Sequence, residues 1–216
     1  MSIKLNLHSH SRHSDGRDTI MDMAKAYKKH DFTCAVITDH HYDGDPYFSM
    51  NKAGFLKSRE EAKEAEELLK IPVIIGIEFG FFRCEEVLCF GKEFILRLYD
   101  GVKSVKEFIE LRREYSSACI VCHPQLREGE MSFIHMGGED AVDGYEHFNR
   151  GVDFFSFREI PPEMKRLTAF SNSDAHKIEN LNSGYNLIKD PIKSEEDLIS
   201  FINHKKPIEL VCKGRK

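Results

Sequence analysis

Side chains that can bind metal ions follow five separate apolar runs of this sequence. A single histidine or acid at the end of a strand is more often a cap or a turn residue than a ligand. Five such endings favour a shared site, because the carboxyl ends of parallel strands open on one face of an α/β fold. The residues are His8 and His10 after IKLNL, Asp39 and His40 after TCAVIT, Glu78 after PVIIGI, His123 after ACIVC, and Asp174 and His176 after LTAFSNS.

The spacing within two of these groups also suits metal ligation. Residues two apart in an extended segment point the same way, so His8 and His10 form a natural pair. Asp174 and His176 can form another. Imidazoles combined with carboxylates suit Zn, Mn or Fe, and a bridging carboxylate lets several ions lie together. Adjacent metal ions favour phosphoester hydrolysis, because they activate a water molecule and neutralise phosphate oxygens.

The elements that must position these side chains alternate between short apolar runs and longer amphipathic ones. This pattern predicts βαβ units and a parallel sheet, either open or closed into a barrel. Residues 42–55 are rich in Gly, Pro, Asp and aromatic residues and are expected to form a loop, and 87–90 is either a hairpin partner or a further strand. The remaining expected strands are 3–7, 33–38, 72–77, 118–122, 144–148 and 167–171, and the expected helices are 19–30, 58–70, 105–115 and 194–204.

The composition indicates a soluble globular protein. A length of 216 residues, without a repeat or a dividing linker, favours one domain over 1–216. No apolar run approaches the roughly 20 residues of a membrane helix. Six cysteines without a signal-peptide pattern favour free thiols in the cytoplasm. The net charge of −5 argues against long nucleic acid as a partner, because such binding depends on basic residues.

Cys119 and Cys122 form a C-x-x-C sequence, which in redox proteins opens a helix. Here the pair lies within an expected strand, where residues three apart face opposite sides. We therefore expect both thiols to pack in the core rather than to form a redox pair.

The order and spacing of the motifs resemble those of the PHP (polymerase and histidinol phosphatase) family of metal-dependent phosphoesterases. The resemblance is densest in LNLHSHSRHSDGRDTIMDMAKAYKKHDFTCAVITDHH, which is similar to the family's HxH, SDG and TDH motifs. GIE at 76–78, CHP at 122–124, DGYEHFNRG at 143–151 and SNSDAH at 171–176 resemble its later motifs. The resemblance implies an α/β fold of the distorted (β/α)7 TIM-like barrel kind, with two or three metals at the carboxyl ends of the strands.

When the family's ligands are matched to this sequence motif by motif, the resemblance also implies which residues would hold each metal. Many family members have a further histidine near the position of Glu86. Glu86 either completes the second site, favouring Mn or Fe over Zn, or is a solvated acid at the start of a strand. His8, His10, Glu78 and Asp174 would hold the first metal, Glu78 and His123 the second, and Asp15, His40 and His176 the third.

The leading hypothesis is hydrolysis of a small phosphomonoester, such as a sugar phosphate, a nucleotide or histidinol phosphate. Asp15 or His176 would assist proton transfer. Arg12 and Lys177 flank the proposed ligands and are candidates for binding the phosphate, the alternative for each being a solvated charge.

Two other functions stay open, namely a phosphodiesterase acting on short oligonucleotides and a non-catalytic module stabilised by metal. Two long loops, 42–56 and 125–138, are expected to set substrate specificity.

Overall fold

The computed structural model describes residues 2–42, 49–80, 86–124, 138–150, 164–204 and 208–213. The strands in these ranges are β1 (Ile3–Leu5), β2 (Ala35–Tyr42), β3 (Val73–Gly80), β4 (Glu86–Phe90), β5 (Ala118–Val121), β6 (Gly144–Asn149), β7 (Thr168–Asn172), β8 (Gly184–Ile188) and β9 (Glu209–Cys212). The α-helices are α1 (Ile20–Lys29), α2 (Lys52–Leu69), α3 (Lys92–Leu98), α4 (Val105–Glu114) and α5 (Glu195–Asn203), and the short 3-10 helices are η1 (Gly138–Ala141), η2 (Met164–Arg166) and η3 (Ile178–Asn180).

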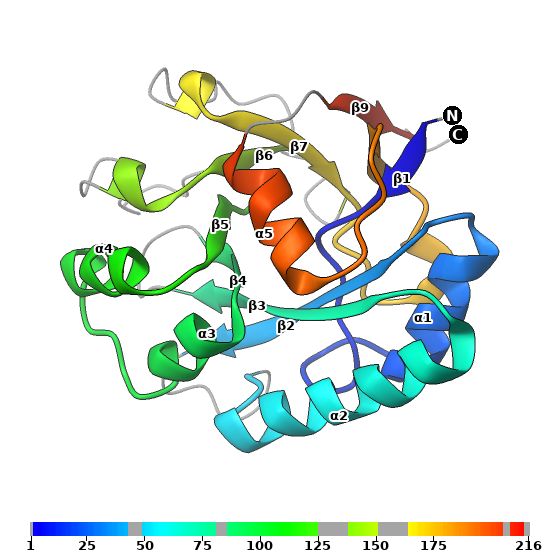
Figure 1. Cartoon of the computed structure of the whole chain (residues 1–216), viewed down its shortest axis with the longest axis horizontal. Helices are drawn as coiled ribbons and strands as arrows, with labels where there is room; N and C mark the ends of the chain where they lie inside the picture. The colour runs from blue at the N-terminus through cyan, green and yellow to red at the C-terminus, as the bar shows by residue number, and fades with distance from the viewer. Residues whose placement is uncertain are drawn as a thin grey trace.

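The strands form two sheets (Figure 1). The larger sheet has the order β2-β3-β4-β5-β6-β7, and the smaller sheet has the order β1-β8-β9. β4 is antiparallel to both β3 and β5, whereas the other neighbours in the larger sheet are parallel. The hairpin alternative for residues 87–90 is therefore confirmed, and the larger sheet is mixed, with the expected parallel pairing between β2 and β3, β5 and β6, and β6 and β7.

The amide of Asn186, in β8, joins the two sheets. Its Nδ2 donates to the carbonyl oxygens of Leu5 (3.0 Å) and Ser171 (2.9 Å), and its Oδ1 accepts from the backbone nitrogen of Ser171 (2.9 Å). A buried side chain thus makes the bonds that a neighbouring strand would otherwise make.

The segment that follows β1 lies between β2 and the chain after β7. The backbone nitrogen of Thr38 donates to Ser9 O (2.8 Å), and Ser9 forms an isolated parallel bridge with Ala175. These are single contacts and not a continuous ladder, so the described strands do not close into one barrel sheet. The α/β class is confirmed, whereas the closed (β/α)7 barrel stays a prediction.

Successive residues of the strands pack into two different cores. Val36 and Ile74 belong to an inner core with apolar residues of α5, whereas Ile37 and Ile75 belong to an outer core with residues of α1 to α4. Figure 1 shows α5 among the strands and α1 to α4 around them. Leu198 of α5 is fully buried, which stabilises the fold by roughly 1.5–3 kcal/mol. α5 therefore fills the inner side of the sheet below its carboxyl edge.

Capping residues explain where the main helices begin. Thr19 accepts a hydrogen bond from Asp22 N at the start of α1, and Ser194 does the same for Asp197 N in α5. The expected helices over 19–30, 105–115 and 194–204 are confirmed within about one residue at each end.

The fourth expected helix begins six residues earlier than residue 58. Asn51 caps it by accepting from Gly54 N (2.9 Å), and α2 runs from Lys52. The loop expected over 42–56 is therefore wrong from Lys52 onward, where Phe55 is a buried helical residue. Residues 43–48, and nearly all of the second expected loop at 125–138, lie outside the described residues. Among the residues that the structure describes, no helix has the length and apolar composition needed to span a membrane.

Candidate metal centre

The centre is built on the inner side of β2 and β3, at their carboxyl ends. His40 and Tyr42 continue the inward alternation of Val36, and Glu78 continues that of Ile74. In the parallel register of the two strands, His40 lies directly opposite Glu78. Backbone geometry alone therefore brings the first imidazole and the first carboxylate together.

Glu78 is fully buried and lies among four imidazoles. Its Oε1 is 3.0 Å from His123 Nε2. Its Oε2 lies 2.8 Å from His40 Nδ1, 3.1 Å from His8 Nε2 and 3.3 Å from His10 Nε2, yet makes no hydrogen bond of good geometry. Burial opposes ionisation of Glu78, but the nearby charges of His8 and His40 and the bond to His123 hold its pKa well below the ordinary value.

His8, His10 and Asp174 complete this buried group. The two Nε2 atoms of the histidines are 3.0 Å apart, and Asp174 Oδ1 lies 3.1 Å from His10 Nε2 and 3.4 Å from His8 Nε2. Burial lowers the pKa of His8, but the carboxylates of Glu78, Glu146 and Asp174 raise it overall well above 6.5. Burial and the charge of His40 lower the pKa of His10. The structure thus brings together the four residues expected to hold the first metal.

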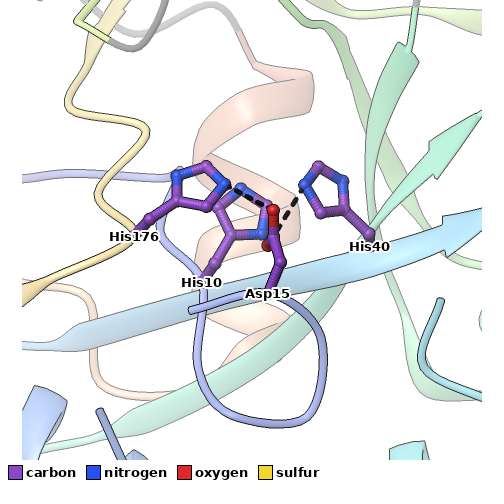
Figure 2. Close-up of side chains that lie close together, drawn as sticks. All are labelled: His10, Asp15, His40 and His176. Carbon is purple, nitrogen blue, oxygen red and sulfur yellow. Dashed lines mark ion pairs between the residues drawn. The ribbon is translucent and has the colours of Figure 1, made fainter. Parts of the chain in front are cut away.

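A second group consists of His10, Asp15, His40 and His176, whose side chains lie close together (Figure 2). Asp15 lies 3.1 Å from His176 Nε2 and 3.4 Å from His40 Nε2, and the ring of His10 stacks on those of His40 and His176 at 4.2 and 4.3 Å. The side chain of His176 is 37% exposed and that of Asp15 27% exposed, whereas His10 is fully buried. This group is therefore the accessible rim of the centre.

The charges of the rim residues depend on one another. Burial opposes ionisation of Asp15, but its bond to His176 and the charge of His40 lower its pKa. Burial lowers the pKa of His176, but Asp15 and Asp174 raise it overall. Burial likewise lowers the pKa of His40, but Glu78, Asp15 and Glu86 raise it to about 9. His40 contacts both Glu78 and Asp15, so it belongs to both groups and not to the rim alone.

Glu86 lies within the centre. Its Oε2 is 3.1 Å from His123 Nε2, and its Oε1 accepts a hydrogen bond from the Tyr42 hydroxyl, which also lies 2.8 Å from His40 Nδ1. This position suits the ligand alternative better than that of a solvated acid. Tyr42 is not among the site residues expected from the sequence, although its spacing of two from His40 on a strand could have indicated it. Burial, with the charges of Glu78 and Glu86, raises the pKa of Tyr42.

Two of the expected ligands have a backbone conformation that is uncommon outside glycine. The φ angles are 24° at His123 and 46° at Asp174. Cys122 faces the inner core, so regular alternation would point His123 outward, but the change in φ lets its ring also reach Glu78. Conformations of this kind cost about 1–3 kcal/mol and cluster at functional sites.

Asp39 holds the loop that carries Asp15. One of its oxygens accepts from Ser11 N and Ser14 Oγ and the other from Ser11 Oγ, all at 2.7 Å. Asp39 followed an apolar run in the sequence, and the structure places it as a support for the loop. His13, on the same loop, pairs with Glu61 at 3.0 Å.

The expected phosphate binders have no described contact that tests their role. Arg12 is exposed, and its Nε donates to Arg17 O at 2.6 Å, so its side chain folds back on its own loop. Lys177 lies between His176 and η3. The binding of phosphate by Arg12 and Lys177 stays a prediction.

Cys119 belongs to the outer core and Cys122 to the inner core, and both thiols are free. Residues three apart on this strand therefore face opposite sides, as expected from the sequence.

The donors of the centre fit divalent transition metals. They are imidazole nitrogens and carboxylate oxygens, the set that Zn, Mn and Fe accept. Glu78 Oε2 and His10 Nδ1 are buried atoms without a hydrogen bond, which is costly unless another partner binds them. Ligand atoms lie within 4.8 Å of one another in several groups, among them His8–His10–Glu78, His40–Glu78–Glu86, Glu78–Cys122–His123 and His10–Asp15–His40–His176.

Solved structures share this fold at low sequence identity. A two-domain protein from Bacteroides vulgatus, which contains a predicted PHP-like metal-dependent phosphoesterase, is 14% identical with a TM-score of 0.64; the match covers 99% of this chain and 65% of that protein. A candidate metal-dependent phosphoesterase from Bifidobacterium adolescentis is 15% identical with a TM-score of 0.57, covering 94% and 96%. PsfC from Pseudomonas syringae is 10% identical with a TM-score of 0.59, covering 94% of each chain.

Family models identify the sequence more directly. No curated protein matches the chain at a significant level. The model of the PHP-associated region matches residues 163–207. The model of the PHP domain matches residues 6–150, which is more than half of the chain and includes His8, His10, Glu78 and His123. The chain therefore belongs to the PHP domain family.

Proposed function

We propose that this protein is a metal-dependent phosphoesterase that hydrolyses a small phosphomonoester. The observation that carries the proposal is the buried carboxylate of Glu78 among four imidazoles, with Asp174 beside them and an opening to solvent at Asp15 and His176. The proposed cofactors are two or three divalent transition metals, Zn, Mn or Fe. The proposed location is the cytoplasm.

Each metal would have its own part of the ligand set. When bound, the metals would supply Lewis acidity that neutralises phosphate oxygens and lowers the pKa of a water molecule. Glu78 would be shared by the first two sites. His8, His10, Glu78 and Asp174 would form the first site, Glu78, His123 and Glu86 the second, and Asp15, His40 and His176 the third.

Asp15 and His176 have alternative roles that depend on metal stoichiometry. Their pair is 3.1 Å apart and partly exposed, so it can exchange protons with solvent and with the leaving oxygen of a substrate. If two metals bind in the buried part, the pair stays free for this role. If three bind, the pair is used for ligation.

The exposed side of the centre indicates where a substrate would enter. The inner core with α5 lies below the ligands, so the exposed rim at His176 and Asp15 is the side from which a phosphate can enter. The proposed substrates are sugar phosphates, nucleotides and histidinol phosphate. Arg12 and Lys177 are proposed to contact the phosphate from this rim.

The test is hydrolysis of p-nitrophenyl phosphate and a panel of phosphomonoesters by metal-free protein reloaded with Zn, Mn or Fe. His8→Ala and Asp174→Ala should each abolish turnover. His204→Ala removes an exposed histidine after α5 and should leave turnover unchanged. The proposal fails if no metal restores turnover, or if the first two variants retain it.

The same assay separates the alternative functions. Faster cleavage of a dinucleotide than of any mononucleotide would indicate a phosphodiesterase. Bound metal, measured by elemental analysis, without turnover on either class would indicate a non-catalytic module.

A further inference from the structure

Glu146 is a buried carboxylate in β6 whose two oxygens are surrounded by N–H donors. Its Oε1 lies 2.8 Å from both His8 Nδ1 and Asn172 Nδ2. Its Oε2 accepts from Asn149 Nδ2 at 2.7 Å and from the backbone nitrogen of His123 at 2.9 Å. The residue is only 2% exposed. Four donors use the lone pairs of the carboxylate, so it has no free position for a metal ion.

The orientation of these donors is fixed by other contacts. Asn172 Oδ1 accepts from Leu7 N (2.9 Å), so its amino group must face Glu146. The His123 donor is a backbone N–H and cannot turn away. The ionised carboxylate only accepts hydrogen bonds, so the proton of His8 must be on Nδ1. Nε2 is then the nitrogen of His8 that is left to bind a metal, and it faces Glu78, His10 and Asp174.

We propose that Glu146 is a positioning residue of the metal centre. It fixes the tautomer and the ring direction of His8 and holds the backbone of His123 in its uncommon conformation. It therefore acts on the first and second metal sites without ligating either. This inference rests on the proposed metal centre.

The alternative role for Glu146 is as a ligand itself. Atoms of His8, Cys122 and Glu146 lie within 4.8 Å of one another, as in a metal site. A metal there would have to displace donors from Glu146. The metal would also bind His8 through Nδ1 and would displace the proton that Glu146 holds there. That proton is what leaves Nε2 of His8 directed toward Glu78. The contacts favour the positioning role.

Glu146→Gln tests this role with little change in size. A glutamine amide offers one oxygen and one amino group, so two of the four donors would face another donor. Either His8 or the His123 backbone then loses its acceptor. We expect the affinity for Zn, measured by competition with a chelating dye, to fall by about 10- to 100-fold. We also expect the visible spectrum of the Co(II)-loaded protein to change, because the ring of His8 would no longer be held in place.

Asp143→Asn is the matched control. Asp143 is also a mostly buried carboxylate, and its Oδ2 accepts from Arg112 Nη2 (2.9 Å) and Cys119 N (2.8 Å), away from the ligands. This variant should lower the melting temperature of the metal-free protein without changing Zn affinity or the Co(II) spectrum.

The outcomes separate this inference from the proposed function. If the wild-type protein binds no metal, the proposed function fails. If it binds metal and Glu146→Gln has the wild-type affinity and spectrum, the positioning role is wrong while the proposed function stands. If Glu146→Gln does not fold, Glu146→Asp provides the same test. Its shorter side chain cannot reach all four donors, and unchanged affinity in that variant would also overturn the inference.

Discussion

Metal binding at this centre should release protons, because four of the five histidines proposed as ligands, all except His10, have a raised pKa and hold protons in the metal-free protein. Burial lowers the pKa of His40, but Glu78, Asp15 and Glu86 raise it to about 9. Burial also opposes charge on His123, but its hydrogen bonds to Glu78 and Glu86 raise its pKa well above 6.5. A nitrogen must be deprotonated to bind a metal, so each such histidine loses a proton on binding.

The magnitude follows from the pKa of His40. At pH 7 this imidazole is about 99% protonated, because the pH is about two units below the pKa. Each proton displaced makes the apparent metal affinity rise about tenfold per pH unit below that pKa. From pH 6.5 to 8, His40 alone would increase the affinity by about 30-fold, and further displaced protons would make the rise steeper.

The assay is calorimetric titration of metal-free protein with ZnCl2 in buffers of different ionisation enthalpy. The dependence of the measured heat on the buffer gives the number of protons released, which should be at least one at pH 7 on full loading. His40→Asn should release about one proton fewer, and His204→Ala should match the wild type. Release of no protons, or an affinity that does not change from pH 6.5 to 8, would refute the reasoning.

Three further predictions concern the fold around the centre. The raised pKa of His40 contributes up to about 3 kcal/mol to the stability of the metal-free protein. This contribution is fully present below pH 6.5 and is lost as the pH rises through 9. The melting temperature of chelator-treated protein should therefore fall over that range, and a rise would contradict the prediction. In Gly76→Ala the new Cβ would lie 2.7 Å from Cys89 O. The free energy of unfolding, measured in urea, should therefore fall by about 1–3 kcal/mol. A variant as stable as the wild type would count against the close packing of β3 and β4. Burial raises the pKa of the Cys34 thiol to about 12, whereas Cys212 is exposed. Iodoacetamide at pH 8 should therefore label Cys212 and spare Cys34 until guanidinium is added. Equal labelling of the two thiols in native protein would show that the core is open.

Most of the ligands could be found from the sequence because they lie at or just after the carboxyl end of a strand, whereas Asp15 lies on a loop and came from the family resemblance. Strand residues alternate in direction every two positions, and parallel strands present their carboxyl ends on one side. His40 and Glu78 obey both rules, and the register of β2 and β3 places them opposite each other. His123 was indicated by its place after the run ACIVC, but simple alternation would not point it inward, and its φ of 24° turns the chain there.

β8 and α3 were missed from the sequence, β8 because it is held by contacts with distant parts of the chain and α3 because it is short. β8 has the sequence GYNLI, in which glycine and a buried asparagine weaken the strand pattern. Asn186 compensates through bonds to Ser171 and to Leu5, which is 181 positions away in the sequence. α3 has only seven residues directly after β4, too short for helical periodicity to be read reliably.

The same reasoning explains why the ligands were easier to predict than the residues that support them. A buried carboxylate in a strand must have partners, because an unpaired charge in the core is too costly, but the requirement does not identify the partners. Glu146 and His8 are 138 positions apart, and a register shift in β6 after Glu146 further obscures which way the following residues point. Only the folded chain shows that this acid meets the second nitrogen of a proposed ligand. The direction of His8 therefore depends on a residue that no spacing rule connects to it.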